Sequence, residues 1–253
     1  MKLDNRLKYL KNMIMTILVY TVLFEQFFWG DTVFFNVKDE MWKMISATAG
    51  LPHDAFLILI GEDRIPALKW IIAELFLFVL AGRETYNRLK HLKYMAVIRY
   101  GSYRKFYFSL MNETVFRALI FGFVGVGTTC VLYSFQGSGI IGNRALLMMG
   151  MIYLSNILLL CLLQTVCMIL IENNAASILL FVIWIIIQLH GWQLGNNIWI
   201  WLPPNWGMYL RSADIAEKGV PYIAYIIQIV GCIIIWILSP IALSKLKKRT
   251  EFI

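Results

Sequence analysis

Ionisable side chains inside apolar runs are the residues of this sequence with the most evident chemistry. They are Glu25, Asp31, Glu74, Glu113 and Arg117. A charge in hydrocarbon costs several kcal/mol unless it is paired or hydrated, so such residues usually face the interior of a helix bundle. Glu113 and Arg117 stand four residues apart, on one helix face and in the orientation that favours an ion pair. The group predicts either a polar path for a substrate or a structural ion pair, with Glu25 or Glu74 as a further partner of Arg117.

Residue patterns typical of enzymes are missing from the sequence. The three histidines, His53, His91 and His190, fall in different layers of the expected structure. The chain has no HExxH or GxSxG motif and no phosphate loop of the form GxxxxGKS or GxxxxGKT, and its cysteines form no CxxC pair. We therefore predict no catalytic residue, metal site or cofactor in this chain, and any ATP hydrolysis would belong to another polypeptide.

The elements that must position these charges follow from the composition. Hydrophobic residues make up 60% of the 253 residues and charged residues only 15%, unlike an ordinary soluble domain. Apolar runs long enough to cross about 30 Å of hydrocarbon recur along the chain. The predicted fold class is an all-α polytopic membrane protein, a single transmembrane domain over residues 1–253. Six transmembrane helices are expected, at about 13–35, 66–82, 106–134, 145–171, 175–193 and 221–243.

The distribution of charge predicts the orientation of these helices. Residues 1–12, 83–105 and 244–253 hold 15 of the 23 Lys and Arg and have a net charge of +12. The segments expected on the opposite side hold seven bases and seven acids. By the positive-inside rule the basic side is cytoplasmic, with both termini inside. The overall charge of +8 is thus a signal of topology, and the expected contact is the lipid bilayer, with no nucleic acid.

Shorter features complete the pattern. Leu3, Leu7 and Leu10 lie at helical spacing between basic residues, which predicts an amphipathic helix in the cytoplasmic headgroup layer.

Residues 54–61 are too short to cross the membrane and form either a re-entrant piece or an external loop. The Trp-rich stretch before the last span is expected to fold back to headgroup level. Pro203-Pro204 prevents a continuous helix there.

The segment "RETYNRLKHLKYMAVIRYGSYRK", residues 83–105, is the long cytoplasmic loop and carries seven basic residues. Its apolar set, which includes Tyr94 and Ile98, predicts a helix along the membrane surface, broken at Gly101-Ser102 and resumed in the third span. Joined to two spans, such an element is suited to receive force from a soluble partner. Contact of Lys and Arg with anionic lipid, worth about 1 kcal/mol each, is the other interpretation, and both can hold.

The sequence resembles a known family at this segment. The resembling stretches are "IRYGS" with the following "RKF", "GRETYNRL" after a span that starts "PALKW", and "LPPNWGMYLRS" before the last span. They resemble the six-span permease subunits of bacterial ABC exporters of type 2, and among them the small bacteriocin-related permeases.

The resemblance implies an N-terminal elbow helix, a coupling helix between spans two and three, and a partly re-entrant segment before span six. It also implies a cytoplasmic ABC ATPase dimer that binds ATP and Mg²⁺, a second copy of the permease or a homologous permease, and a location in the bacterial cytoplasmic membrane. The substrate would move outward, with bacteriocins, toxins or antimicrobial peptides expected first and lipids second. A stand-alone membrane immunity or binding protein is the alternative class.

The residues expected to contact the ATPase come from the same segment. They are Tyr94, Ile98, Arg99, Tyr100, Gly101, Ser102, Arg104 and Lys105.

Overall fold

The computed structural model describes residues 9–19, 21–22, 64–135, 144–171, 174–190, 198–207, 213 and 219–250. The regular structure in this part of the chain is helical, and none of these residues belongs to a β-strand. A short helix, Tyr9–Val19, comes first. The elements that follow are α4 Arg64–Tyr100, α5 Tyr103–Phe135, α6 Arg144–Ile171, α7 Asn174–His190, the 3₁₀ helices η2 Ile198–Trp201 and η3 Pro203–Gly207, and α8 Tyr222–Thr250.

Three of the described helices are long and apolar enough to cross a membrane, over Tyr103–Thr128, Gly150–Ile171 and Tyr222–Leu246. This confirms an all-helical membrane protein, because a spanning helix satisfies every backbone hydrogen bond internally. The helices Tyr9–Val19 and Asn174–Gln188 are apolar but shorter, so the number of six spans stays a prediction. Residues 1–8 of the expected elbow helix, most of the first span with Glu25 and Asp31, and residues 54–61 lie outside the described residues.

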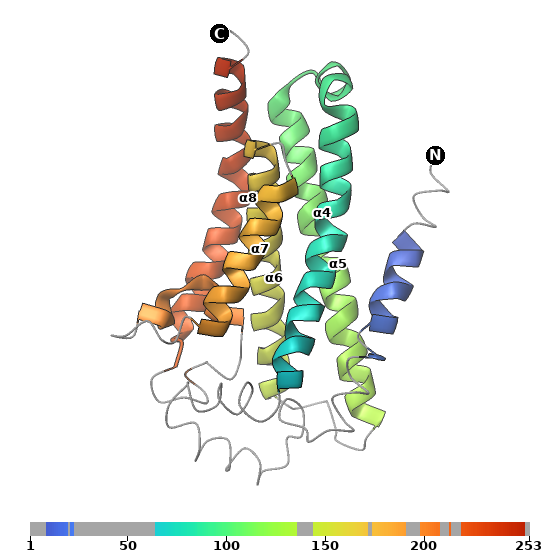
Figure 1. Ribbon diagram of the computed structural model, residues 1–253, viewed down its shortest axis with the longest axis vertical. Helices are drawn as coiled ribbons and strands as arrows, with labels where there is room; N and C mark the ends of the chain where they lie inside the picture. The colour runs from blue at the N-terminus through green and yellow to red at the C-terminus, as the bar shows by residue number, and fades with distance from the viewer. Residues whose placement is uncertain are drawn as a thin grey trace.

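Helix α6 lies at the centre of the bundle. Figure 1 shows α4, α5, α6, α7 and α8 running side by side, with the Tyr9–Val19 helix beyond α5. In an 18-residue stretch of the Gly150–Ile171 span 61% of the residues are buried, against 22% in such a stretch of the Tyr222–Leu246 span of α8. Side chains of α6, among them Ile157 and Leu160, are fully buried against the neighbouring helices. The outer helices instead expose branched side chains, as lipid contact requires, and those on α7 are Ile178, Leu179, Val182, Ile183 and Ile186.

Helix α4 is longer than the sequence predicted. Its 37 residues span about 55 Å at 1.5 Å per residue, well beyond the about 30 Å of hydrocarbon. The segment 83–105 is therefore not a loop with a separate surface helix: residues 83–100 continue α4. The reason is local, since Arg, Glu, Leu and Lys are strong helix formers and the stretch 83–100 contains no Pro or Gly.

The expected break at Gly101-Ser102 is confirmed. Gly101 has φ of 72°, a left-handed conformation that favours glycine and commonly ends a helix. Ser102 then caps α5, because its Oγ accepts a hydrogen bond from the Lys105 backbone N–H at 3.3 Å. Helices α4 and α5 thus form a hairpin, and its turn lies at the same end of the bundle as the C-terminal end of α8 (Figure 1). We call residues 83–105 the basic tip.

The stretch before α8 folds into the bundle. As expected, the two prolines do not lie in an α-helix: residues 198–201 form η2 and residues 203–207, which include both prolines, form η3. Trp199 and Trp206 are buried in a cluster with Ile152 of α6 and Tyr225 of α8. This segment, which we call the η segment, therefore packs on the helices instead of resting only among headgroups.

Candidate functional site

Two groups of buried polar side chains lie between the helices. The Glu113 cluster joins α4, α5 and α6 on the side of the basic tip, and consists of Thr85, Arg88, Tyr100, Ser109, Glu113, Thr114, Arg117 and Thr165. The Glu74 cluster joins α4, α6, α7, α8 and η3, and consists of Glu74, Ser155, Asn156, Gln188, Pro204 and Gln228.

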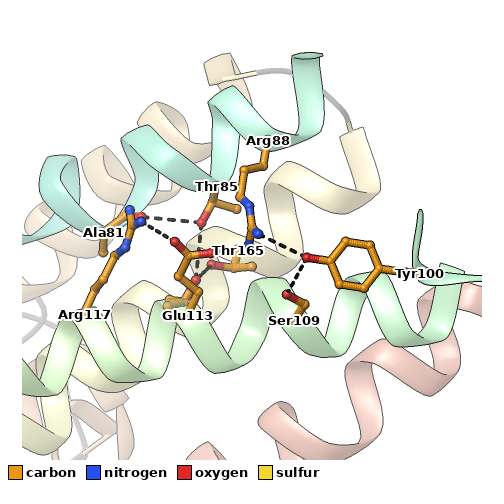
Figure 2. A network of polar contacts seen from close by, with 9 residues as sticks. Ala81, Thr85, Arg88, Tyr100, Ser109, Glu113, Arg117 and Thr165 are labelled. Atoms are coloured by element: carbon orange, nitrogen blue, oxygen red, sulfur yellow. Dashed lines mark hydrogen bonds and ion pairs between the residues drawn. The ribbon is translucent and has the colours of Figure 1, made fainter. Parts of the chain in front are cut away.

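The centre of the first cluster is one carboxylate between two guanidinium groups. Glu113 pairs through Oε1 with Arg117, four residues on in α5, and through Oε2 with Arg88 of α4. Figure 2 shows both arginines pointing toward it. The side chains of Arg88 and Glu113 are 23% and 24% exposed, and that of Arg117 only 8%. Among the described residues these three side chains therefore carry one net positive charge in a mostly buried position.

The ion pairs extend to the turn of the hairpin. Arg88 Nη2 donates a hydrogen bond to the Tyr100 hydroxyl at 3.2 Å. Ser109 Oγ donates to the same hydroxyl at 3.4 Å (Figure 2). Tyr100 is the last residue of α4, so these contacts hold the end of α4 against α5.

Threonine hydroxyls connect the same three helices. Thr85 Oγ1 and Thr114 Oγ1 lie 3.3 Å apart, and Thr114 Oγ1 lies 2.8 Å from Thr165 Oγ1. Thr165 in turn donates to the backbone oxygen of Cys161 at 3.0 Å. The chain of hydroxyls fixes the register of α4, α5 and α6 just below the ion pairs.

Arg117 also contacts the first helix. Its guanidinium carbon lies 5.7 Å from the centre of the Tyr9 ring, within the range of a cation–π interaction. The same ring contacts Phe116 and Phe121 of α5 at 6.4 and 6.3 Å between ring centres. This aromatic group covers the apolar side of the arginine.

The second cluster surrounds a carboxylate with amides. Glu74 is fully buried at 0% exposure. Its Oε1 accepts hydrogen bonds from Asn156 Nδ2 at 3.2 Å and from Gln188 Nε2 at 2.9 Å. Asn156 and Gln188 are themselves buried, at 0% and 1% exposure. Amide dipoles from two helices therefore stabilise the oxygen of a residue on a third.

Further hydrogen bonds carry this cluster to α8 and η3. Gln228 Nε2 donates to Asn156 Oδ1 at 3.2 Å, and Ser155 Oγ donates to Gln228 Oε1 at 3.2 Å. Gln188 Nε2 donates also to the Pro204 backbone oxygen at 3.2 Å. A single amide group thus connects α4 to the η segment.

A glycine lets the η segment approach this closely. A Cβ at Gly207 would lie 2.2 Å from Asn156 Nδ2 and 3.1 Å from its Cβ. Asn156 cannot turn away without breaking its bonds to Glu74 and Gln228. A residue larger than glycine at 207 would therefore push the η segment off the cluster.

An open depression lies on the surface beside the Glu113 cluster. It is lined by Ser102, Arg104, Lys105, Phe108, Ser109 and Asn112. Trp236 of α8 donates through Nε1 to Asn112 Oδ1 at 2.7 Å at its edge. Arg104 and Lys105, both predicted partner contacts, are exposed here.

The other predicted contacts lie on the hairpin as well. Tyr94, Ile98 and Arg99 belong to the last turns of α4, and their side chains lie outside the described part of the structure. Tyr100 and Ser102 are used within the hairpin, the first in the ion-pair cluster and the second as the cap of α5. The eight predicted positions are thus brought to one end of the bundle, with different tasks.

Of the expected partners of Arg117, the structure confirms Glu113 and does not confirm Glu74. The pair with Glu113 is confirmed. Glu74 instead accepts hydrogen bonds from Asn156 and Gln188. Thr85 of α4 lies opposite Thr114 of α5, so Arg117 lies at about the level of residue 82 of α4. Glu74 is about eight residues, or about 12 Å, farther from the basic tip. Glu25 lies outside the described residues. No group of His, Cys, Asp or Glu suited to hold a metal ion occurs in the described part of the chain.

Sequence reasoning missed Arg88, Asn156, Gln188 and Gln228. A signal for the amides was present, because each stands in an otherwise apolar run, as in "YLSNILLL" and "IIIQLH". Polar side chains in such runs commonly hydrogen-bond across helices. Arg88 was counted only as one of the bases of the cytoplasmic side.

The chain matches no protein-family model, no curated protein and no solved structure. Fold and site define the class as a helical membrane protein with two buried polar clusters.

Proposed function

We propose that this chain is the membrane-spanning permease subunit of an ATP-driven ABC exporter of type 2. A separate cytoplasmic ATPase dimer binds its basic tip, and the permease works with a second copy or a homologous permease. The family resemblance of the sequence supports this proposal, together with the absence of a phosphate loop in this chain.

The observation that carries the proposal is the construction of the α4–α5 hairpin. An element that receives force from a partner must project from the bilayer and must not bend under load. Helix α4 is long enough to project, and the Glu113 ion pairs and the Tyr100 contacts tie it to α5 just before the turn. Arg104 and Lys105 are exposed beside that turn, where they can meet acidic groups of a partner.

The two polar clusters have different roles in this proposal. The Glu113–Arg117 pair is structural, because it is shared with Arg88 and stiffens the hairpin. The Glu74 cluster lies where several helices and the η segment meet, which suits a part that changes during transport. The cargo proposed from the family resemblance is a peptide such as a bacteriocin, toxin or antimicrobial peptide.

Co-purification tests the proposal. The affinity-tagged chain is expressed with the ATPase encoded beside it, and retention of the ATPase is measured by quantitative immunoblot. The double variant R104Q/K105Q should lose about tenfold or more of the bound ATPase, since rim charges steer and strengthen such contacts. The matched control is K245Q, an exposed base on α8 outside the tip.

Three results would count against the proposal. They are a chain that never retains an ATPase, an equal loss of ATPase with K245Q, and a stand-alone protective activity that survives R104Q/K105Q. The last would favour the membrane immunity or binding protein.

A further inference from the structure

The η segment, residues 198–207, is built as a self-contained unit. Asn205 Nδ2 donates to the Trp199 backbone oxygen at 2.8 Å, and Trp206 Nε1 donates to the Ile200 backbone oxygen at 2.6 Å. Because these two bonds lie within the segment, they stay made when the segment shifts as a body. Its short 3₁₀ helices also have weaker internal geometry than an α-helix and often occur at hinges.

Besides its apolar contacts with α6 and α8, this unit is joined to the bundle by a hydrogen bond from the Glu74 cluster. Gln188 Nε2 is shared between Glu74 Oε1 and the Pro204 backbone oxygen. Gly207 lies against the amide of Asn156, which Glu74 also holds. The position of the Glu74 carboxylate therefore sets where both amides point and where the η segment fits.

We propose that the Glu74 cluster is a latch and that the η segment is the gate it holds closed. A shift of α4 along its axis moves the acceptor oxygen of Glu74, Gln188 follows it, and Pro204 is released. The η segment then leaves its apolar seat on Ile152 and Tyr225 and opens the side of the bundle between α7 and α8.

Helix α4 connects this latch to the basic tip. Glu74 and Tyr100 are 26 residues apart in the same α-helix, or about 39 Å along the path of the helix. A movement of the tip can therefore reach the latch through one continuous helix. This part of the inference rests on the proposed function, because it needs a partner that moves the tip; the latch itself does not.

Accessibility of a buried position in the η segment tests the latch. Ile200 is 9% exposed, and I200C is introduced in a chain whose four native cysteines are replaced. The purified protein in lipid nanodiscs is reacted with a water-soluble maleimide, so that neither the orientation in the membrane nor an ATPase matters. Q188M, which keeps the length of the side chain but removes its hydrogen bonds to Glu74 and Pro204, should raise the labelling rate of I200C about fivefold or more.

Two further variants separate the latch from general loosening. Q228M removes an equally buried amide of the same cluster, whose hydrogen bonds run to Asn156 and Ser155 of α6, and it should leave the labelling rate within twofold of the parent. G207A changes no hydrogen-bonding group, yet its Cβ would lie 2.2 Å from Asn156 Nδ2, so it should raise the rate as Q188M does. If Q188M does not fold, G207A carries the test alone.

The outcomes are decisive in both directions. Raised labelling with Q188M or G207A, and not with Q228M, supports the latch. Unchanged labelling in Q188M and G207A, or an equal rise in Q228M, overturns it. A further outcome separates the latch from the tip. If the variants behave as expected but I200C labelling does not change when ATP and the co-purified ATPase are added, the latch is supported and its link to the tip is wrong. Failure of the proposed function is seen separately, as a chain that retains no ATPase.

Discussion

The carboxylates of Glu113 and Glu74 differ in the groups that surround them. Glu113 lies between two guanidinium groups and keeps partial contact with solvent, with 24% of its side chain exposed. Glu74 is completely buried and receives hydrogen bonds from the amides of Asn156 and Gln188. Along α6 the two levels, marked by Thr165 and Asn156, are nine residues or about 13 Å apart.

The difference indicates which cluster is rigid and which can rearrange. Separating an ion pair that is shielded from water is costly, so the Glu113 cluster favours one arrangement of α4 and α5. Amide groups can exchange one acceptor for another with little change in charge, and Gln188 Nε2 already donates to two acceptors, Glu74 Oε1 and the Pro204 oxygen. The molecule therefore has a stiff hairpin on the side of the basic tip and an adjustable junction farther along the same helix.

Removal of the Glu113 carboxylate should have the largest effect. E113L leaves Arg117, 8% exposed, without its counter-charge, which should cost about 3–5 kcal/mol of unfolding free energy. Arg88, at 23% exposure, can turn toward solvent. Thermal unfolding of the purified protein in detergent measures the loss.

Two companion variants sharpen this prediction. R117M should be milder than E113L, because Glu113 keeps Arg88 as its partner. The double variant E113L/R117M should regain most of the stability lost in E113L, since no buried charge is then unpaired. If R117M proves as harmful as E113L, the shared carboxylate is not the centre of the cluster.

The Glu113–Arg117 ion pair could be predicted from the sequence, and the other contacts of the two polar clusters could not. Glu113 and Arg117 are four residues apart, so helix geometry alone brings them together. The helix break at Gly101-Ser102 and the absence of an α-helix at Pro203-Pro204 follow equally from local chemistry. Local signals of this kind act within one turn of the chain.

Contacts between distant segments depend on packing that local patterns do not specify. Arg88 reaches Glu113 across 25 residues, and Gln188 reaches Glu74 across 114. Which face of each apolar helix meets its neighbour is decided by side-chain fit over the whole bundle. An amide in a hydrophobic run predicts that it has a partner, and only the tertiary structure says which one.

Substitution of Glu74 should have the next largest effect. E74L removes the acceptor of Asn156 Nδ2, while Gln188 keeps the Pro204 oxygen, so the cost should be at least about 1–3 kcal/mol, the usual cost of a buried donor left without an acceptor. E74Q retains an acceptor oxygen and should lose less than E74L in the same unfolding measurement. If E74Q and E74L are equally harmful, the charge and not the hydrogen bonding stabilises this cluster, and the contrast with Glu113 disappears.

The smallest effect is expected at the hydroxyls below the ion pairs. T114V keeps the shape of the side chain and removes its bonds to Thr85 and Thr165, but these two still donate to the backbone oxygens of their own helices. Hydrogen bonds between membrane helices contribute about 0.6 kcal/mol each on average, so T114V, which removes two of them, should lower the unfolding free energy by about 1 kcal/mol. T128V is the matched control, because Thr128 donates only to the Val124 oxygen of its own helix at 2.8 Å. A loss with T114V as large as with E113L would mean that the hydroxyls, and not the shared carboxylate, hold α4 and α5 together. The contrast between a charged Glu113 cluster and a hydrogen-bonded Glu74 cluster would then disappear.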